Sequence, residues 1–247
     1  MNVIIEFIIV SGLFAVAYML FFRMETRHGL NRAYLLGSLV LSSVLPFLPK
    51  MFGAINTPQI ISVLLPTALI GASTESGTAT ANAGSTSIIV WLWLIGSTIV
   101  LVRSIWGIYR ILRLNKRQEV IADQTVNITN GNHPPFSFFN GIFIPEKHDF
   151  DQKEIRKIVL HESSHTRLLH GMDLLLLQVF HIICWWNPFI YLYRKLLQET
   201  HEYQADAHVI QREDPIDYSR FLLANANALP RMTLAHQFFT QPLKSRI

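Results

Sequence analysis

Charged residues and cysteine are scarce in this chain of 247 residues. Only 15% of the residues are charged and 50% are hydrophobic, whereas a soluble domain carries roughly 25% charged residues. This composition excludes a disordered chain and argues against an ordinary cytosolic enzyme. The single cysteine excludes an intrachain disulfide and suits a reducing compartment. The net charge of +4 is small and scattered, so it does not indicate direct binding of nucleic acid.

The shortage of charge is confined to the first half of the chain. Residues 1–109 hold 8 charged side chains and residues 110–247 hold 30. The second segment is therefore about 22% charged, which is close to the usage of soluble proteins. We predict a membrane domain over residues 1–109 and a water-exposed domain over residues 110–247.

Three apolar segments of the first half are candidates to cross a bilayer. They cover residues 3–22, 33–49 and 87–109, and a bilayer core of ~30 Å needs about 20 such residues. The first segment could instead be a signal peptide. Its start is acidic, at Glu6, and its end at Arg23 lacks a small-residue cleavage site. We therefore expect three retained transmembrane helices.

Lysine and arginine in the connections predict the orientation of these helices. Residues 23–32 hold three arginines and residues 110–117 hold four basic residues, whereas residues 49–86 hold only Lys50. The basic segments should face the cytosol, which places the N-terminus outside and everything after residue 109 inside. Within the long connection, residues 58–70 are expected at the interface and residues 72–87 as a flexible loop.

A β-hairpin is predicted at the start of the second half. Asn140-Gly141 is the favoured pair for a type I′ turn, and residues that favour strands flank it on both sides. Pro145 should end the second strand. A packed apolar loop is the alternative interpretation of this segment.

A helix is predicted directly after the hairpin. Asp151 and Glu154 have the spacing of a capping box. The helix should run from Gln152 to about Leu169, with Gly171 after its end.

This predicted helix carries the pattern H-E-x-x-H, from His161 to His165. Residues four apart on a helix differ by about 40° in direction, so both imidazoles can point at one ion. Glu162 projects beside them and can take a proton from water at the metal without binding the metal. Two imidazoles, a carboxylate and an open fourth position suit zinc. The pattern arises by chance in roughly 1% of such chains. The alternative interpretation is therefore that His161 and His165 are only surface residues of an amphipathic helix.

The third ligand is expected on a later helix, which begins with Asn187 as N-cap and Pro188 at the first helical position. That helix carries Glu199, Glu202 and Asp206, and spacing alone does not choose among them. Glu202 and Asp206 share a helix face, so one can bind the metal while the other bonds to a ligand imidazole.

The chain between the two helices offers a weaker candidate. His170 would lie about 140° around a continuous helix from His165, so we do not expect it to be a ligand. The apolar residues 174–186 are too few for a full span. We expect them to form a helix that is buried in the domain or lies against the membrane.

Three motifs, taken in order, resemble the BlaR/MecR-type membrane metallopeptidases, the antirepressor sensor-transducers of β-lactam resistance. These motifs are His161-Glu-x-x-His165, Trp186-Asn-Pro-Phe189 and His201-Glu-Tyr-x-Ala-Asp206. Residues 136–145 resemble the hairpin before the zinc helix of these proteins, and residues 238–247 resemble the stretch before their last span. The resemblance extends over the whole chain.

The resemblance implies a mainly α fold. In this fold, N-terminal transmembrane helices precede a cytosolic gluzincin-like zinc-peptidase domain with a small β-hairpin. The implied site residues are His161, His165 and Glu202 as zinc ligands, Glu162 as general base and Asp206 beside the ligands.

The resemblance also implies a substrate site and a role. The hairpin residues Phe138, Phe139, Asn140 and Gly141 would supply an edge strand against which a substrate peptide is laid. The implied function is regulated proteolysis at the cytoplasmic membrane of a bacterium. A signal from outside activates the cytosolic site, which cleaves a transcriptional repressor of the winged-helix type and the protein itself.

Two departures from this family stand out. The chain stops at Ile247, before the fourth span and the sensor domain that such proteins usually carry. It is therefore expected to be a truncated product, a fragment, or a transducer whose signal enters by another route. It also lacks the Ser-x-x-Lys motif of a penicillin-binding sensor, so β-lactam sensing is not supported.

Two other functions remain as alternatives. One is a CAAX-type or quality-control membrane protease, which pairs the same two motifs but usually places spans between or after them. The other is a receptor or scaffold whose zinc site is structural or lost. The sequence does not indicate the oligomeric state.

Overall fold

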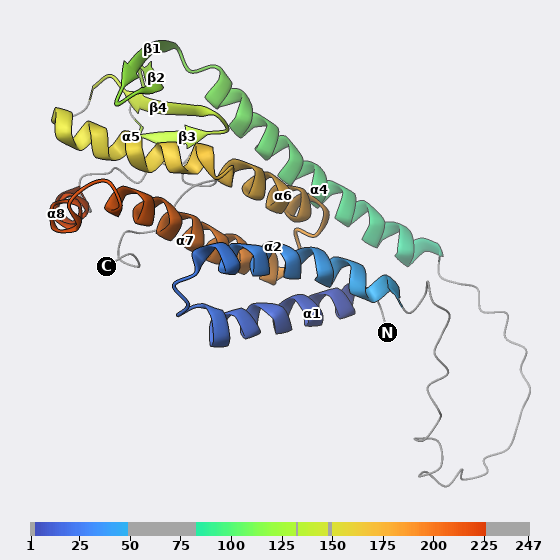
Figure 1. The fold of residues 1–247 in the computed structure, drawn as a ribbon. Helices are drawn as coiled ribbons and strands as arrows, with labels where there is room; N and C mark the ends of the chain where they lie inside the picture. Colours follow the sequence, from blue (N-terminus) through green and yellow to red (C-terminus); the bar gives the residue numbers. More distant parts are fainter. Residues whose placement is uncertain (1–2, 49–82, 132, 148–149, 226–247) are drawn as a thin grey trace, which may run out of the picture.

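The structure, a computed structural model, describes residues 3–48, 83–131, 133–147 and 150–225. Helices make up most of it, and a small sheet lies against one end of the helical bundle (Figure 1). The expected mainly α fold is confirmed. The expected interfacial segment 58–70 and the resembling stretch 238–247 lie outside the described residues.

Within the described residues, three helical segments are long and apolar enough to cross a membrane: Val3–Phe22, His28–Phe47 and Ile88–Leu112. They contain α1 (Val3–Ala17), which continues as a π-helical turn (Tyr18–Phe22), α2 (His28–Val44), which continues as a 3₁₀ turn (Leu45–Phe47), and most of α4 (Ala83–Leu112). The second segment begins five residues earlier than expected. Helix α4 begins inside the segment expected as a flexible loop, so that expectation was wrong from residue 83 onward.

The sheet has four strands, in the order β1-β2-β4-β3. These are β1 (Lys116–Ile121), β2 (Gln124–Thr129), β3 (Phe136–Phe138) and β4 (Gly141–Pro145). Strand β2 pairs with β1 antiparallel and with β4 parallel, while β3 pairs with β4 antiparallel. The predicted hairpin is therefore present as β3 and β4, but it is half of a larger sheet.

The turn of this hairpin lies one residue earlier than expected. Phe138 pairs with Gly141, so Phe139 and Asn140 form the loop. Phe139 has a left-handed backbone, with φ of 49°. The expected type I′ turn at Asn140-Gly141 was therefore wrong. Two consecutive residues with positive φ occur instead at Ala122 and Asp123, between β1 and β2.

Helix α5 (Gln152–Arg167) begins as predicted. The Asp151 side chain accepts a hydrogen bond from the Glu154 amide, and the Glu154 side chain accepts one from the Asp151 amide. This reciprocal pair satisfies two amides that the first turn leaves without helical partners. The buried residues of α5 contact the sheet on one side and α7 on the other.

The end of α5 differs from the prediction. The helix stops at Arg167, and Leu169 adopts the left-handed backbone that glycine usually supplies, with φ of 55°. A second helix, α6 (His170–Ile183), then begins at an angle of 56° to the first. Gly171 lies in the first turn of α6 rather than after the end of α5.

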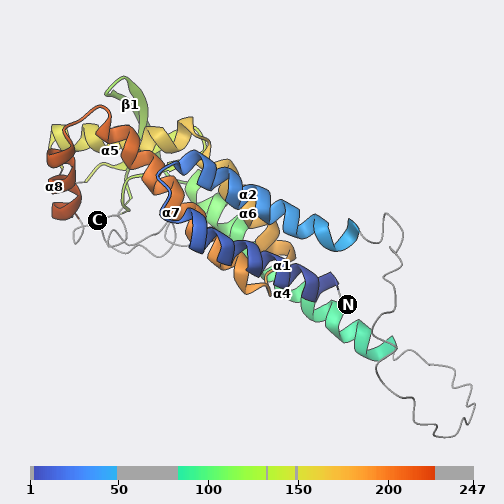
Figure 2. The same ribbon diagram turned by 60° about the horizontal axis from the view of Figure 1, so that its bottom comes forward.

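Helix α7 (Pro188–Ile210) begins as predicted, with the Asn187 side chain accepting a hydrogen bond from the Phe189 amide. Helix α8 (Pro215–Asn225) follows. Figure 2 shows α1 and α2 running alongside α7. Side chains of α1, α2, α6 and α7 form one hydrophobic core cluster, which includes Leu35, Leu39, Leu177, Tyr193 and Leu197.

Candidate metal centre

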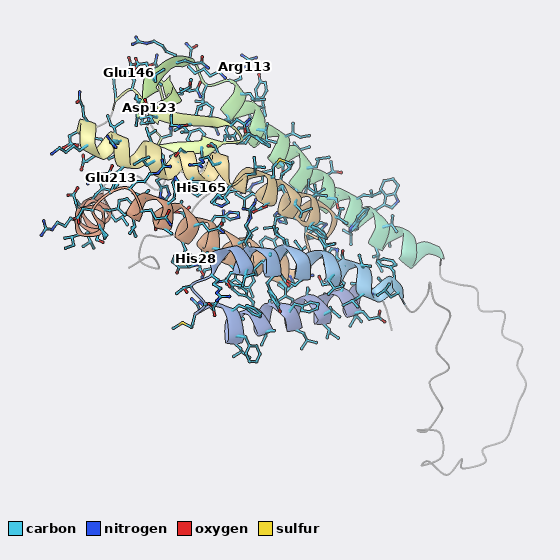
Figure 3. The ribbon with its side chains drawn as sticks, in the orientation of Figure 1. His28, Arg113, Asp123, Glu146, His165 and Glu213 are labelled. Atoms are coloured by element: carbon cyan, nitrogen blue, oxygen red, sulfur yellow. The ribbon has the colours of Figure 1, made fainter. Side chains whose placement is uncertain are left out.

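Helices α5 and α7 bring His161, His165 and Glu202 together, each from a partly buried position. The Nε2 atoms of the two histidines are 3.2 Å apart. The Glu202 carboxylate places Oε2 3.6 Å from His161 Nε2 and Oε1 3.6 Å from His165 Nε2. Ala205 on α7 is fully buried, one turn after His201. Its small side chain lets α5 and α7 pack closely. Figure 3 shows His165 between these two helices.

The spacing of these three atoms fits a metal ion. Ligand atoms about 2.05 Å from a tetrahedral zinc ion lie about 3.3 Å from one another. The observed separations of 3.2 and 3.6 Å bracket that value. Two imidazole nitrogens and a carboxylate oxygen are also a donor set that zinc accepts. The residues present therefore fit the metal that the sequence suggests.

His161 has two partners on its other ring nitrogen. Its Nδ1 atom lies 3.2 Å from Oδ1 of Asp206 and 3.2 Å from the Tyr218 hydroxyl. The Tyr218 hydroxyl in turn donates to Asp206 Oδ1 at 2.8 Å. A carboxylate at this position holds the Nδ1 proton and directs Nε2 toward the three-residue cluster. Asp206 thus lies where the sequence suggested, and Tyr218 on α8 is an addition that no sequence motif indicated.

His165 has a different partner. Its Nδ1 atom lies 2.8 Å from Nδ1 of His170, and His170 Nε2 lies 2.9 Å from Oε1 of Gln204. Because the Gln204 oxygen can only accept, His170 Nε2 carries the proton, and its Nδ1 accepts from His165. Burial, together with His201 and His165, lowers the pKa of His170 to about 2, so this ring is neutral. We expected His170 to face away from His165, and that was wrong because the helix ends between them.

A buried polar chain continues from His170 to the membrane helix α2. The rings of His170 and His201 stack with centroids 3.9 Å apart. His201 Nε2 lies 2.7 Å from Asp173 Oδ2, and the Arg32 guanidinium donates to both oxygens of Asp173, at 2.7 and 3.1 Å. Burial alone would raise the pKa of Asp173, but these hydrogen bonds lower it below its usual value. The sequence analysis did not single out Arg32, Asp173 or the role of His201.

The remaining candidates take separate places. Glu162 is partly buried next to His161 on α5. Glu199 is buried and does not belong to the three-residue cluster found in the described part of the chain. The hairpin turn lies beside the start of α6, because a Cβ atom on Gly171 would lie 3.6 Å from the Phe139 backbone nitrogen. Phe139 and Asn140 are exposed, while Phe138 and Gly141 are partly buried.

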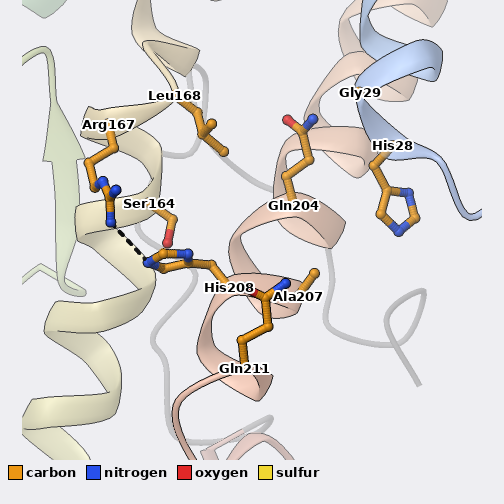
Figure 4. Close-up of a pocket in the computed structure, with 9 residues that line it drawn as sticks. All are labelled: His28, Gly29, Ser164, Arg167, Leu168, Gln204, Ala207, His208 and Gln211. Atoms are coloured by element: carbon orange, nitrogen blue, oxygen red, sulfur yellow. Dashed lines mark hydrogen bonds between the residues drawn. The ribbon is translucent and has the colours of Figure 1, made fainter.

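A cavity of about 420 Å³ lies against the same two helices but does not include the cluster (Figure 4). Three of its lining residues are basic: His28, Arg167 and His208. Arg167 Nη1 donates to His208 Nε2 at 3.5 Å, as the dashed line in the figure shows. Gln204, the partner of His170, lines this cavity on the α7 side.

Comparison with known proteins supports the motifs described above. A model of the family described as BlaR1 peptidase M56 matches residues 137–247, which include most of the hairpin, the H-E-x-x-H helix and α7. No curated protein matches the chain. The match and the three apolar helices indicate a membrane peptidase of a metal-dependent kind. Over residues 137–247, the chain is therefore similar to the BlaR1 peptidase M56 family.

Proposed function

We propose that the protein is a membrane-anchored zinc endopeptidase that cleaves a cytosolic protein. The observation that supports this best is the convergence of His161, His165 and Glu202 at separations that match a zinc coordination sphere. A catalytic zinc ion has four coordination positions, of which three are filled by the protein and one is open to water or substrate. Three protein ligands are therefore the set that such a site needs.

Each group of the site has a distinct task in this proposal. Zinc, when bound, would polarise the scissile carbonyl and lower the pKa of water at the open position to about 7. The Glu162 carboxylate accepts a proton from the attacking water and passes it to the nitrogen of the leaving amine. Asp206 and Tyr218 hold the His161 ring in the tautomer that leaves Nε2 unprotonated.

Strand β3 is the proposed docking site for the substrate peptide. It occupies the edge of the sheet, it pairs only with β4 among the described strands, and it contacts α5. A peptide added to this edge would form main-chain hydrogen bonds with β3 and pass near the hairpin turn at Phe138, Phe139, Asn140 and Gly141. This arrangement suits an extended segment of a protein more than a folded surface.

The biological role proposed is signal-dependent cleavage of a transcriptional repressor, in line with the family of antirepressor peptidases. The basic connections of the membrane domain favour an active site on the cytosolic side. Incubating the purified protein with a winged-helix repressor encoded beside its gene should give discrete fragments, and a chelator should stop their formation. Intact repressor in the presence of zinc-loaded protein would count against this substrate.

We predict that His170 supports the metal site through its hydrogen bond to His165 and not only through packing. Replacing His170 with leucine removes the acceptor for His165 Nδ1–H, so zinc affinity should fall by about 10–100-fold. Replacing it with asparagine keeps a hydrogen-bond acceptor at a similar position and should restore most of the affinity. Competition with a chromogenic chelator measures both values.

The outcome for His170 is informative in either direction. Equal zinc affinity of the leucine variant and the wild type would show that His170 does not position His165. Equal losses in both variants would indicate a packing effect instead of a hydrogen bond. The visible spectrum of the cobalt-loaded variants provides a readout of ligand geometry that folding defects alone do not move.

A CAAX-type or quality-control protease remains the second candidate. One observation favours it: taken together, α5 and α6 are long and apolar enough to cross a membrane, although they are bent by 56°. Such proteases usually place membrane segments between the two metal-binding motifs. Mapping the depth of α6 in the bilayer therefore bears on this alternative.

A further inference from the structure

We infer that α6, the turn after it and the first half of α7 form a re-entrant hairpin, which enters the bilayer from the cytosolic side and turns back inside it. The exposed apolar face of α6 would then contact lipid acyl chains. This inference concerns how the domain sits in the membrane. It depends on the membrane assignment and not on catalysis.

The tip of the hairpin contacts the interior of two spans. Asn187, in the turn, donates from Nδ2 to Ser11 Oγ at 3.2 Å, and the Trp93 indole donates to the Ile183 carbonyl at 2.9 Å. Ser11 lies near the middle of the segment Val3–Phe22, and Trp93 lies inside Ile88–Leu112. If these segments cross the membrane, the turn lies at a depth that only acyl chains and protein occupy.

Ring packing at the tip confirms this close approach. A Cβ atom placed on Gly12 of α1 would lie 2.7 Å from the Phe189 ring, and one placed on Gly96 of α4 would lie 2.3 Å from the Trp185 ring. Both rings therefore occupy the space that a larger residue would need. Glycine and serine at such contacts are typical of helices packed within membranes.

The farther a hairpin residue lies from the tip, the closer its contact on the spans lies to their cytosolic ends. Tyr193, two turns after the tip on α7, hydrogen-bonds Ser38 within α2 at 3.0 Å. Farther on, Thr200 hydrogen-bonds Tyr18, near the end of the first span, at 3.2 Å. On the other arm, Asp173 near the start of α6 pairs with Arg32 near the start of α2. Both arms thus reach from the membrane surface to the same inner depth.

The surface of α6 agrees with this depth. The five large apolar side chains exposed on it are Met172, Leu175, Leu176, Val179 and Ile183, each between 36% and 50% exposed. No charged residue occurs between positions 174 and 186. A row of this kind facing water would be unusual for a soluble domain. This row on α6 lies next to the exposed apolar side chains of α4, which would also face lipid. The two helices together therefore form one continuous apolar surface.

Gln178, a buried polar side chain in the middle of α6, is paired on both sides. Gln178 of α6 donates to Ser104 Oγ of α4 at 2.6 Å and accepts from Arg194 of α7 at 2.9 Å. Two amides of the turn are also paired, since the Cys184 amide donates to the Phe180 carbonyl and the Asn187 amide to the Cys184 carbonyl. Irregular backbone at membrane depth is tolerated when it is buried in protein in this way.

Length decides between a re-entrant hairpin and a full span. Helix α6 has 14 residues, so it is about 21 Å long. This is shorter than the ~30 Å hydrocarbon core but longer than half of it. The hairpin therefore returns to the side from which it entered. The three-residue cluster lies at the cytosolic end of the hairpin, level with the cytosolic ends of the spans. A substrate would meet this site at the bilayer surface.

Nitroxide labels on single-cysteine variants of the full chain in liposomes test this inference. In a Cys184→Ser background, Val179→Cys reports on α6, Ile99→Cys on α4 and Ile216→Cys on α8; all three parent side chains are exposed, at 47%, 62% and 64%. We expect the label at Val179 to match that at Ile99. Its collision rate with a water-soluble nickel chelate should be several-fold lower than at Ile216, and its collision rate with oxygen should be higher.

Three results would overturn the inference. The label at Val179 could match that at Ile216, which would place α6 in water. It could show the accessibility of the headgroup region, which would make α6 an interfacial helix. A cysteine at Ile183, at the end of α6, could react with an impermeant reagent from the outer face of sealed vesicles, which would show a full span. Leu176→Cys, on the same face of α6, replaces Val179→Cys if that variant does not fold. The test needs no zinc, so its outcome is independent of the proposed activity.

Discussion

Replacing Glu162 with glutamine is expected to abolish peptide cleavage while zinc stays bound. Glutamine has nearly the same shape but cannot accept a proton from the attacking water. Loss of a general acid–base group typically lowers the rate by about 10²–10⁴-fold, and a loss at or above the upper end of this range is expected here. Cleavage of the repressor or of a model peptide by equal amounts of zinc-loaded protein measures the effect.

The control for this prediction is the metal content of the same preparation. Because Glu162 is not among the three residues of the cluster, the variant should hold as much zinc as the wild type. Wild-type activity in Glu162→Gln would contradict the assigned mechanism. Loss of both zinc and activity would instead give Glu162 a place in metal binding.

Replacing Glu202 with alanine should remove the metal. Its carboxylate lies 3.6 Å from the Nε2 atoms of both His161 and His165, so its loss leaves two protein ligands. The fall in zinc affinity should exceed the about 10–100-fold typical of residues outside the ligand set. Zinc competition with a chelator and elemental analysis after dialysis report this change.

Glu199→Gln is the matched control for Glu202→Ala. Glu199 is an acidic residue on the same helix, three residues earlier, and its carboxylate is not part of the cluster. We expect this variant to keep its zinc. Retention of zinc by Glu202→Ala together with its loss from Glu199→Gln would mean that the third ligand was chosen wrongly. A wild-type protein that binds no zinc would favour the receptor or scaffold alternative.

Local patterns in the sequence predicted the elements that carry the site. The capping pair Asp151 and Glu154 and the N-cap Asn187 set the starts of α5 and α7 where expected. The four-residue spacing of His161 and His165 then follows from helical geometry alone. These features depend on neighbours in the sequence, which is why they could be predicted without a structure.

Long-range contacts could not be predicted in the same way. The break at Leu169 requires a left-handed leucine, which local propensity disfavours, and it turns His170 back toward His165. The buried hydrogen bonds of His170 offset that conformational cost, but they involve Gln204 on a distant helix. The pair of Arg32 and Asp173 joins a membrane helix to the second half of the chain. No spacing rule connects residues so far apart.

X-ray absorption spectroscopy of the zinc-loaded protein tests the central claim most directly. The account predicts a shell of nitrogen and oxygen ligands at about 2.0–2.1 Å, with outer-shell scattering from two imidazoles. The imidazole scattering should weaken in His161→Ala. A sulfur shell at about 2.3 Å, or a spectrum without imidazole scattering, would contradict the assignment of His161, His165 and Glu202 as the zinc ligands.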